Sequence, residues 1–468
     1  MKKTGLFLYI IFLCNVNFAQ VQNLKKYIEE GRTFDQIYSK ASKFLRKSES
    51  NETSEKTKTK KSKIFKYLPE EEFMRLERWA WYWRDRTNVD GTLGDPGMQW
   101  ELYKEQTAFN PYQRSGLTWK HEGPTSNTGG YWSMGRTTHI DFHPNDSKTF
   151  YVAAANGGVW KTTNSGKSYA SIGENLPQQP VGIVIVDQKN PNTIFITIGE
   201  KDGWWQYGLG VYKTTNGGQT WSPTGLSYKL SDNRVIYGLV MNPFNSNILI
   251  ASTNNGIFKT TDAGVSWNKV RTEDFSDVKY KIGDPNIVYA ARNDYWGSCE
   301  VFKSTDGGDN WNQISNFNKQ KSSFRLVSTP ADPEYLGINA SEDGRTAFYL
   351  SKNGGNNFEF ISSPPENSVL FISPTETGIV YCGSTKIHKS FDGGYSWNTI
   401  TNWYNDGVLP EVHADHHFVS FTNRTKNEIY FCHDGGLNKY DENTESWEEL
   451  SNGLPITQFY KMAISTTT

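Results

Sequence analysis

The chain has 468 residues, of which 49 are Lys or Arg and 50 are Asp or Glu, so its formal net charge at neutral pH is −1. This balance argues against nucleic acid as a partner, because nucleic-acid binding needs a strongly basic surface. Aromatic residues make up 14% of the chain, which predicts a large core and surfaces on which sugars or peptides can stack. The length suits one large β domain with an N-terminal appendage.

Residues 1–19 have the three parts of a signal peptide. Lys2 and Lys3 form the basic end, residues 6–13 form the apolar core, and Ala19 ends a small-residue cleavage site. The apolar run is too short to span a bilayer. We therefore expect an exported protein, either secreted or held at the cell surface or in the periplasm. It would have no transmembrane segment after signal cleavage.

Two segments precede the repeats. Residues 20–66 start with a helical pattern, and from Lys47 onward they contain almost nothing to bury, which is typical of a flexible tether. Residues 67–131 start with a helix at Pro69, followed by three glutamates that suit the positive end of the helix dipole. Ala80 and Trp83 fall on its apolar face. A loop and a lead-in strand at residues 117–121 complete this segment.

From residue 132 onward, one eight-residue pattern recurs, in which a Ser or Thr precedes an Asp or Asn, a Gly and an aromatic residue. The Asp or Asn can accept backbone N–H groups within a turn, and the Gly can supply a positive φ angle. These residues are therefore predicted to be structural. The near-complete copies are centred on Asn164, Asn216, Asp262, Asp306, Asn353 and Asp392.

Each repeat contains four short strand-like runs separated by turn signals. Inner strands are expected at residues 138–142 and 235–241, and second strands at residues 149–154 and 193–198. Four strands per repeat of about 45 residues form a propeller blade. We therefore predict an all-β, seven-bladed β-propeller over residues 132–455, closed by itself or part of a larger ring, with an N-terminal helical extension. Residues 456–468 look like the first strand of a further blade.

The recurring pattern resembles the Asp-box, or BNR, repeat of sialidases, xyloglucanase-type glycoside hydrolases and the sortilin ectodomain. The run from Gly123 to Tyr460 is similar to secreted bacterial BNR-repeat proteins, which are often labelled sortilin-like or glycosyl-hydrolase-like. The resemblance implies that each Asp-box lies at the outer hairpin of a blade, away from the binding face.

Enzymes with this repeat differ from the chain at the positions that matter for catalysis. Sialidases need three arginines and an Arg-Ile-Pro motif; Arg136, Arg234 and Arg325 stand at inner-strand starts, but the motif does not occur. The stretch 155–160 resembles xyloglucanases, yet Asn156 stands where that family places a catalytic Asp. An amide cannot act as a general base. The family's second catalytic Asp lies in a second propeller, which we do not expect in this chain.

Two stretches carry residues suited to a ligand site at the channel face. The first holds carboxylates beside aromatics, namely Glu200, Asp202, Trp204 and Trp205. The second holds the histidine-rich residues His413, Asp415, His417, His433 and Asp434. If residues 413–417 form a strand, alternate side chains share one face. We expect this second group to converge on one polar site, with Glu200 on a facing blade.

The leading interpretation is a non-catalytic propeller that binds a glycan or a peptide at its channel face, through these residues together with the three inner-strand arginines. One alternative is a sialidase- or xyloglucanase-like glycoside hydrolase with a non-standard carboxylate pair, such as Glu200 with Asp202 or Asp415. Another is a structural or adhesive surface module. No cofactor is required, although His413, Asp415, His417 and His433 are compatible with a divalent cation.

Overall fold

The computed structural model describes the residues 33–40, 42–43, 77, 80, 83–84, 87–93, 133–177, 180–201, 208–293, 299–317, 321–342, 345–422 and 425–457. The predicted signal peptide, the tether after Lys47, the lead-in strand and residues 458–468 lie outside these ranges. The chain divides into two compact units, one made of residues 1–117 and 229–233 and the other of the remaining residues.

In the first unit, residues 34–40 are helical, and the side chains of Phe34, Ala80 and Trp83 pack together in a small apolar cluster. Ala80 and Trp83 are buried, as expected for the apolar face of the helix predicted from Pro69, whose start lies outside the described residues. Within the described ranges, no helix is both long enough and apolar enough to cross a membrane.

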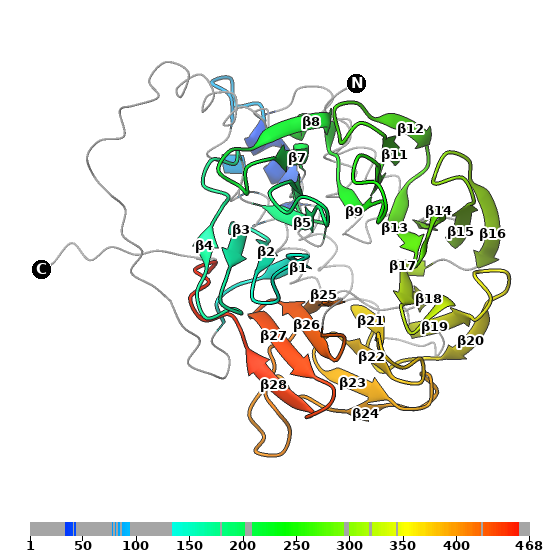
Figure 1. Ribbon diagram of the computed structural model, residues 1–468. Helices are drawn as coiled ribbons and strands as arrows, with labels where there is room; N and C mark the ends of the chain where they lie inside the picture. Colours follow the sequence, from blue (N-terminus) through cyan, green and yellow to red (C-terminus); the bar gives the residue numbers. More distant parts are fainter. Residues whose placement is uncertain are drawn as a thin grey trace, which may run out of the picture. The chain divides into compact units, whose positions relative to one another are not determined.

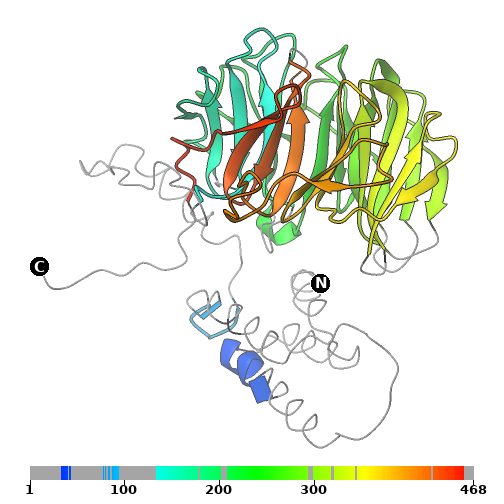
Figure 2. The same cartoon turned by 90° about the horizontal axis from the view of Figure 1, so that it is seen from below.

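The described part of the second unit forms seven four-stranded antiparallel sheets arranged as a ring (Figure 1). In every sheet the strand order follows the chain order, so each blade is one contiguous stretch of sequence. The predicted fold class, a seven-bladed propeller, is confirmed. Figure 2, seen from below, shows the blades side by side with their strands spanning the thickness of the ring.

In each blade the strands run in chain order from the centre of the ring outward. Blade 1 contains β1 (Thr137–Phe142), β2 (Phe150–Ala154), β3 (Gly158–Thr162) and β4 (Ala170–Ser171). Blade 2 contains β5 (Val181–Val186), β6 (Ile194–Ile198), β7 (Gly210–Thr214) and β8 (Ser222–Ser227). Blade 3 contains β9 (Ile236–Met241), β10 (Leu249–Thr253), β11 (Gly256–Thr260) and β12 (Asn268–Arg271). Blade 4 contains β13 (Phe275–Lys281), β14 (Asp284–Asn293), β15 (Cys299–Ser304) and β16 (Asn312–Phe317).

Three further blades complete the ring, and a 3₁₀ turn, η1 (Leu230–Asp232), lies between β8 and β9 in the chain. Blade 5 contains β17 (Lys321–Thr329), β18 (Asp332–Glu342), β19 (Arg345–Ser351) and β20 (Glu359–Ser362). Blade 6 contains β21 (Val369–Ile372), β22 (Val380–Gly383), β23 (Ile387–Ser390) and β24 (Asn398–Thr399). Blade 7 contains β25 (His416–Phe421), β26 (Glu428–His433), β27 (Gly436–Asp441) and β28 (Ser446–Glu449).

Burial follows the position of a strand within its blade. Every residue of β2, β6 and β10 is buried, because the middle of a blade is covered on both faces by neighbouring blades. This explains why these strands read as continuous apolar runs rather than as alternating patterns. The outermost strands β12 and β24 are largely exposed. The core is therefore a series of apolar layers between blades. Polar side chains that could serve a site are found at the two edges of the ring.

Antiparallel order decides which turns share an edge. The starts of the innermost strands, the turns between second and third strands, and the links between blades all lie at one edge, which we call the first edge. The recurring Asp/Asn turns lie at the opposite edge. In one of them, Asp262 Oδ1 accepts a hydrogen bond from the backbone N–H of Ser266 at 2.9 Å, and Thr260 Oγ1 accepts one from that of Gly264 at 3.0 Å.

The ring closes by side-chain and backbone contacts between blades 7 and 1, since no strand is exchanged between these two sheets. Ile456, which the sequence suggested as part of a further strand, packs in the same apolar cluster as Met134 and Ile140 of blade 1. A Cβ atom on Gly135 would lie 2.2 Å from the carbonyl oxygen of Ile456, so this close approach requires glycine. Thr457 Oγ1 donates to the carbonyl of Met134 at 2.8 Å.

Candidate active site

Six of the seven innermost strands, all except β21, carry a β-bulge near the first edge. In blade 1 the bulged residue is Thr138, whose hydroxyl donates to the carbonyl of Val181 in blade 2 at 2.7 Å. In blade 4 it is Ser276, whose hydroxyl donates to the carbonyl of Phe324 in blade 5 at 2.5 Å. In blade 7 the bulged residue is His417. Its Nε2 instead lies 2.6 Å from Asp434 Oδ1 within its own blade. Bulges often re-aim a side chain beside a functional site.

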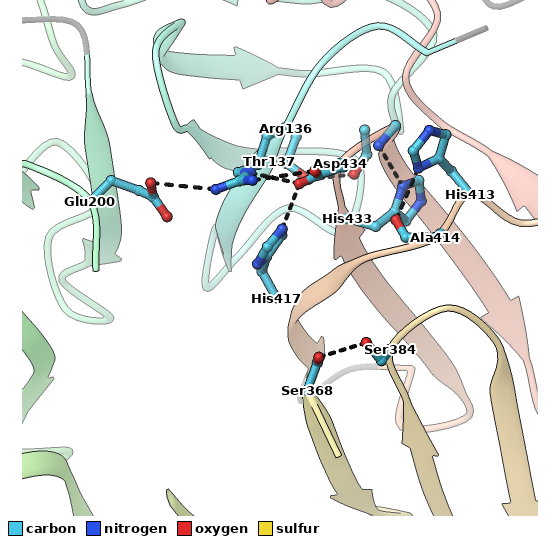
Figure 3. Close-up of polar contacts among 12 residues, drawn as sticks. Arg136, Thr137, Glu200, Ser368, Ser384, His413, Ala414, His417, His433 and Asp434 are labelled. Atoms are coloured by element: carbon cyan, nitrogen blue, oxygen red, sulfur yellow. Dashed lines mark hydrogen bonds and ion pairs between the residues drawn. The ribbon is translucent and has the colours of Figure 1, made fainter. Parts of the chain in front are cut away.

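Arg136 joins this pair from blade 1, just before β1 begins. Its Nε donates to Asp434 Oδ1 at 2.6 Å and its Nη2 donates to Asp434 Oδ2 at 3.2 Å, so one guanidinium grips both carboxylate oxygens. Its Nη1 lies 3.6 Å from Oε2 of Glu200, which follows β6 in blade 2. Figure 3 shows the guanidinium between the two carboxylates. Arg136, Glu200, His417 and Asp434 are called the Arg136 cluster below.

The two carboxylates of the Arg136 cluster differ in exposure. The side chain of Asp434 is 30% exposed, whereas that of Glu200 is 1% exposed. Burial raises the pKa of Asp434, but hydrogen bonds from His417 and Arg136 outweigh this effect and lower the pKa to about 2. Asp434 is therefore ionised throughout the neutral and mildly acidic range.

Backbone contacts of a tight turn fix the position of Asp434. It lies in the tight turn between β26 and β27, and its N–H donates to the carbonyl of Asp415 at 3.1 Å. The next residue, Gly435, touches the His413 ring so closely that a Cβ atom would lie 2.4 Å from its Cγ. The backbone N–H of Met134 donates to the carbonyl of Gly435 at 3.1 Å, which attaches the turn to blade 1.

His413 and His433 form a second group beside the Arg136 cluster. Their rings stack with centroids 5.9 Å apart. His433 Nε2 lies 2.7 Å from Asn438 Oδ1, and His433 Nδ1 accepts from the backbone N–H of Gly435 at 3.1 Å. Only a neutral ring with its proton on Nε2 satisfies both partners. Burial and the nearby His413 lower the pKa of His433 to about 3.

The strand predicted over residues 413–417 is corrected by the structure. β25 begins at His416, and Asp415 has a φ of 61°, in the left-handed region. This turn breaks the alternation of side chains, so the strand argument does not hold across His413, Asp415 and His417. Asp415 is exposed and contributes its backbone carbonyl to the site, while His416 is 1% exposed inside blade 7.

Other predicted site residues lie elsewhere. Arg234 precedes β9 in blade 3 and Arg325 lies in β17 of blade 5, so the three arginines sit on blades 1, 3 and 5. Asp202, Trp204 and Trp205 lie outside the described residues. Asn156 is exposed in the turn between β2 and β3 at the first edge. Over the described ranges, no three His, Cys, Asp or Glu side chains are grouped so that they could hold a metal ion.

The sequence predicted one site for His417 and Asp434 with Glu200 on a facing blade, but it did not pair Arg136 with them. Arg136 and Asp434 are 298 residues apart, and only ring closure brings them together. The signal that could have found the site is the residue type at the bulge: a His at the inner-strand start where blades 1 and 4 carry Thr138 and Ser276.

No protein-family model matches the chain. Among curated proteins, xyloglucanase Xgh74A of Acetivibrio thermocellus is 25% identical over 308 residues, which is 60% of this chain and 32% of that protein. A xyloglucanase of Hypocrea jecorina is 27% identical over 160 residues, covering 31% of this chain and 19% of the relative. One from a Paenibacillus species is 22% identical over 319 residues, covering 64% and 28%. The chain thus spans about a third or less of the length of these relatives.

The fold of this chain is also similar to solved structures of GH74 enzymes. The GH74 xyloglucanase from Xanthomonas campestris aligns with a TM-score of 0.54 and 13% identity, over 70% of this chain and 56% of that one. The GH74 enzyme from Niastella koreensis aligns with a TM-score of 0.53 and 18% identity, over 70% and 55%. The propeller is therefore similar in fold to those of GH74 enzymes. The finer resemblance to sortilin-like Asp-box proteins stays a prediction.

These matches overturn the leading interpretation from the sequence. A non-catalytic propeller that binds a glycan or a peptide was expected, but the curated relatives are xyloglucanases by name. The Asn at position 156 in place of the family's usual Asp does not decide against catalysis, because a carboxylate pair can come from other blades. The similarity favours the alternative, a glycoside hydrolase, over a binding module.

Proposed function

We propose that this propeller acts in the hydrolysis of a β-linked glucan of the xyloglucan type, with the Arg136 cluster as its reaction centre. One observation carries the proposal: two carboxylates from different blades, Glu200 and Asp434, meet a single guanidinium in a propeller whose sequence relatives are xyloglucanases. We also propose that the chain is exported, on the basis of residues 1–19, and that its partner is a glycan.

Glycoside hydrolysis needs two carboxyl groups, one to protonate the leaving oxygen and one to support the positive charge on the sugar or to activate water. Because Arg136 contacts both carboxylates, at 3.6 Å and 2.6 Å, their nearest oxygens lie within about 9 Å of each other. Glycosidases separate the two groups by roughly 5–9.5 Å. The upper limit for Glu200 and Asp434 falls within this range, with the Arg136 guanidinium between the two groups.

The two environments suggest a division of roles. Asp434, ionised and 30% exposed, would face the sugar and stabilise the positive charge that develops at the anomeric carbon. Glu200, on the far side of Arg136, is assigned as the second carboxyl group, the one that acts on the leaving oxygen. Arg136 and His417 would keep the carboxylate of Asp434 in place through charge-assisted hydrogen bonds.

The test is hydrolysis of xyloglucan and unbranched β-glucans by the purified full chain, followed as new reducing ends. Glu200→Gln and Asp434→Asn should each lower kcat by about 10²-fold or more. Asp309→Asn is the matched control, since Asp309 is a carboxylate at the opposite edge of the ring; its kcat should equal that of the parent. No reducing ends from any β-glucan, or full activity in both site variants, would overturn the proposal.

A further inference from the structure

The turn between β2 and β3 contains a side-chain amide that the proposed reaction does not use. Residues 155–157, which we call the Asn156 turn, connect the two strands at the first edge of blade 1, and Asn156 is exposed at the centre of the turn. The next residue is Gly157. An Asn-Gly pair is chemically reactive, because the backbone nitrogen of the glycine reaches the side-chain carbonyl carbon of the asparagine without hindrance from a Cβ atom. Whether such a pair reacts depends on how the folded chain holds it.

The Asn156 turn is held by groups that do not take part in this reaction. The N–H of Ala155 donates to the carbonyl of Arg136 at 3.2 Å, and Trp160 Nε1 donates to the carbonyl of Gly157 at 2.7 Å. Within the described part of the chain, neither the side-chain amide of Asn156 nor the backbone N–H of Gly157 makes a hydrogen bond. Asn156 can therefore rotate toward the nitrogen of Gly157 without breaking any of the described hydrogen bonds.

The chain contains the same tripeptide twice more, in turns at the opposite edge. Asn-Gly-Gly occurs at residues 156–158, 216–218 and 353–355. In the second copy, Asn216 Oδ1 accepts the backbone N–H of Thr220 at 3.0 Å and the hydroxyl of Thr214 at 2.7 Å. The backbone N–H of Gly217 also has a partner, since it donates to the carbonyl of Asn192 at 2.9 Å. Both reacting groups of this copy are therefore held by hydrogen bonds.

The third copy is held in the same way as the second. Asn353 Oδ1 accepts the backbone N–H of Asn357 at 3.2 Å and the hydroxyl of Ser351 at 2.9 Å. The backbone N–H of Gly354 donates to the carbonyl of Glu334 at 2.9 Å. In both turns the asparagine side chain and the glycine nitrogen must give up these bonds before they can react. The fold therefore protects two copies of the tripeptide and leaves the copy at Asn156 unprotected.

We propose that Asn156, unlike Asn216 and Asn353, is a site of spontaneous deamidation in the folded protein. The backbone nitrogen of Gly157 attacks Cγ of Asn156 and closes a five-membered succinimide ring. The side-chain nitrogen leaves as ammonia and takes with it the proton of the Gly157 N–H. Water then opens the ring: addition at Cγ gives aspartate, and addition at the backbone carbonyl carbon gives isoaspartate. The net reaction consumes water, releases ammonia and needs no cofactor.

The modification adds a carboxylate to the first edge of the ring. The Asn156 turn is bonded to the backbone of Arg136, so the new charge appears on the blade that carries the guanidinium of the Arg136 cluster. The packing of the ring also preserves the reactive pair, because a Cβ atom on Gly157 would lie 2.6 Å from Cγ2 of Ile456. This chemistry is independent of whether the chain cleaves glucans.

The experiment follows the three Asn-Gly-Gly copies in the full chain. The purified protein is incubated at mildly alkaline pH, either folded or in guanidinium chloride, and peptide mapping by mass spectrometry measures the aspartate and isoaspartate formed at each copy. In the folded protein, Asn156 should convert about tenfold or more faster than Asn216 or Asn353, because it breaks no hydrogen bond first. In denaturant the three rates should lie close together, since the tripeptide is the same.

The variant Asn156→Gln is the matched control. Glutamine would have to close a six-membered ring, which is much slower, so the acidic species that forms from the folded parent on ion exchange should be absent from this variant. An Asn156 that stays intact in the folded protein while it converts in denaturant would show that the fold protects it, and would overturn the proposal. Equal rates at the three copies in the folded protein would also reject it, as would the same order of rates in denaturant, because flanking sequence rather than hydrogen bonding would then decide which copy reacts.

Discussion

Arg136 Nε and Asp434 Oδ1 lie 2.6 Å apart although 298 residues separate them in the chain. The pair crosses the boundary at which blade 7 meets blade 1, so the contact that organises the proposed reaction centre is also one that closes the ring. Thr137 reinforces the boundary by donating its hydroxyl to the carbonyl of Gly436. Stability and function are therefore expected to change together at this boundary.

Replacing Arg136 should change stability and activity together. Arg136→Gln removes a charge-assisted pair in which both side chains are less than one third exposed, and should lower the free energy of unfolding by about 1–3 kcal/mol. It should also lower kcat. Arg136→Lys keeps the charge but loses the two-oxygen grip, so it should recover part of the stability and little of the activity. Denaturant unfolding and xyloglucan hydrolysis measure the two effects; a Gln variant as stable as the parent would contradict this interpretation.

Acid should destabilise the propeller partly through His433. Its pKa is lowered to about 3 by burial and by His413, while the unfolded chain has the ordinary value near 6.5. Between these values the unfolded state binds the extra proton, so stability is complete above pH 6.5 and decreases as the pH falls toward 3. In the variant His433→Gln, the melting temperature should therefore depend less steeply on pH within this window. An unchanged slope would show that His433 is not the group responsible.

The turns at the opposite edge should matter for stability alone. Asp262→Ala removes the acceptor for the N–H and the hydroxyl of Ser266, and should lower the melting temperature by about 1–3 °C. Asp262→Asn should be milder, because Asn164 accepts the equivalent N–H, that of Ser168, at 2.9 Å. Glucan hydrolysis should be unchanged in both. Loss of hydrolysis at an unchanged melting temperature would place these turns at the substrate face.

Gly435→Ala should disturb the turn that aims Asp434. The new Cβ would meet the His413 ring at 2.4 Å, and overpacking of this kind costs about 1–3 kcal/mol. We expect lower stability and lower kcat. The double variant His413→Ala/Gly435→Ala removes the clash and should be more stable than Gly435→Ala. If the second substitution gives no recovery, the glycine is required for another reason.

The repeat made the fold predictable. The inner strand expected at residues 138–142 is β1 at Thr137–Phe142, and the second strand expected at 193–198 is β6 at Ile194–Ile198. These boundaries could be predicted because Gly, Pro and Asn mark the turns, and because a buried second strand is a continuous apolar run. A short periodic signal with six near-complete copies also predicts the architecture.

The site was less predictable because its contacts are non-local. The alternation rule failed at Asp415, where a left-handed residue separates His413 from β25. The role of His417 depends on a bulge, which adds one residue to a strand without a clear mark in the sequence. The folded loop of residues 402–411 was not predicted, because the sequence does not mark that the exposed Asp406 binds the backbone N–H groups of Val408 and Leu409 and the side chain of Asn402.

The two ends of the described propeller lie side by side, since Thr457 bonds to Met134 and Ile456 covers Gly135. Each blade is also contiguous in sequence. A short peptide joining residue 457 to residue 133 could therefore connect the ends covalently, and new termini could be opened without dividing a blade in an exposed link between blades, such as that around Glu174 between β4 and β5. The propeller is thus suited to circular permutation, and to insertion as a cassette within a longer polypeptide.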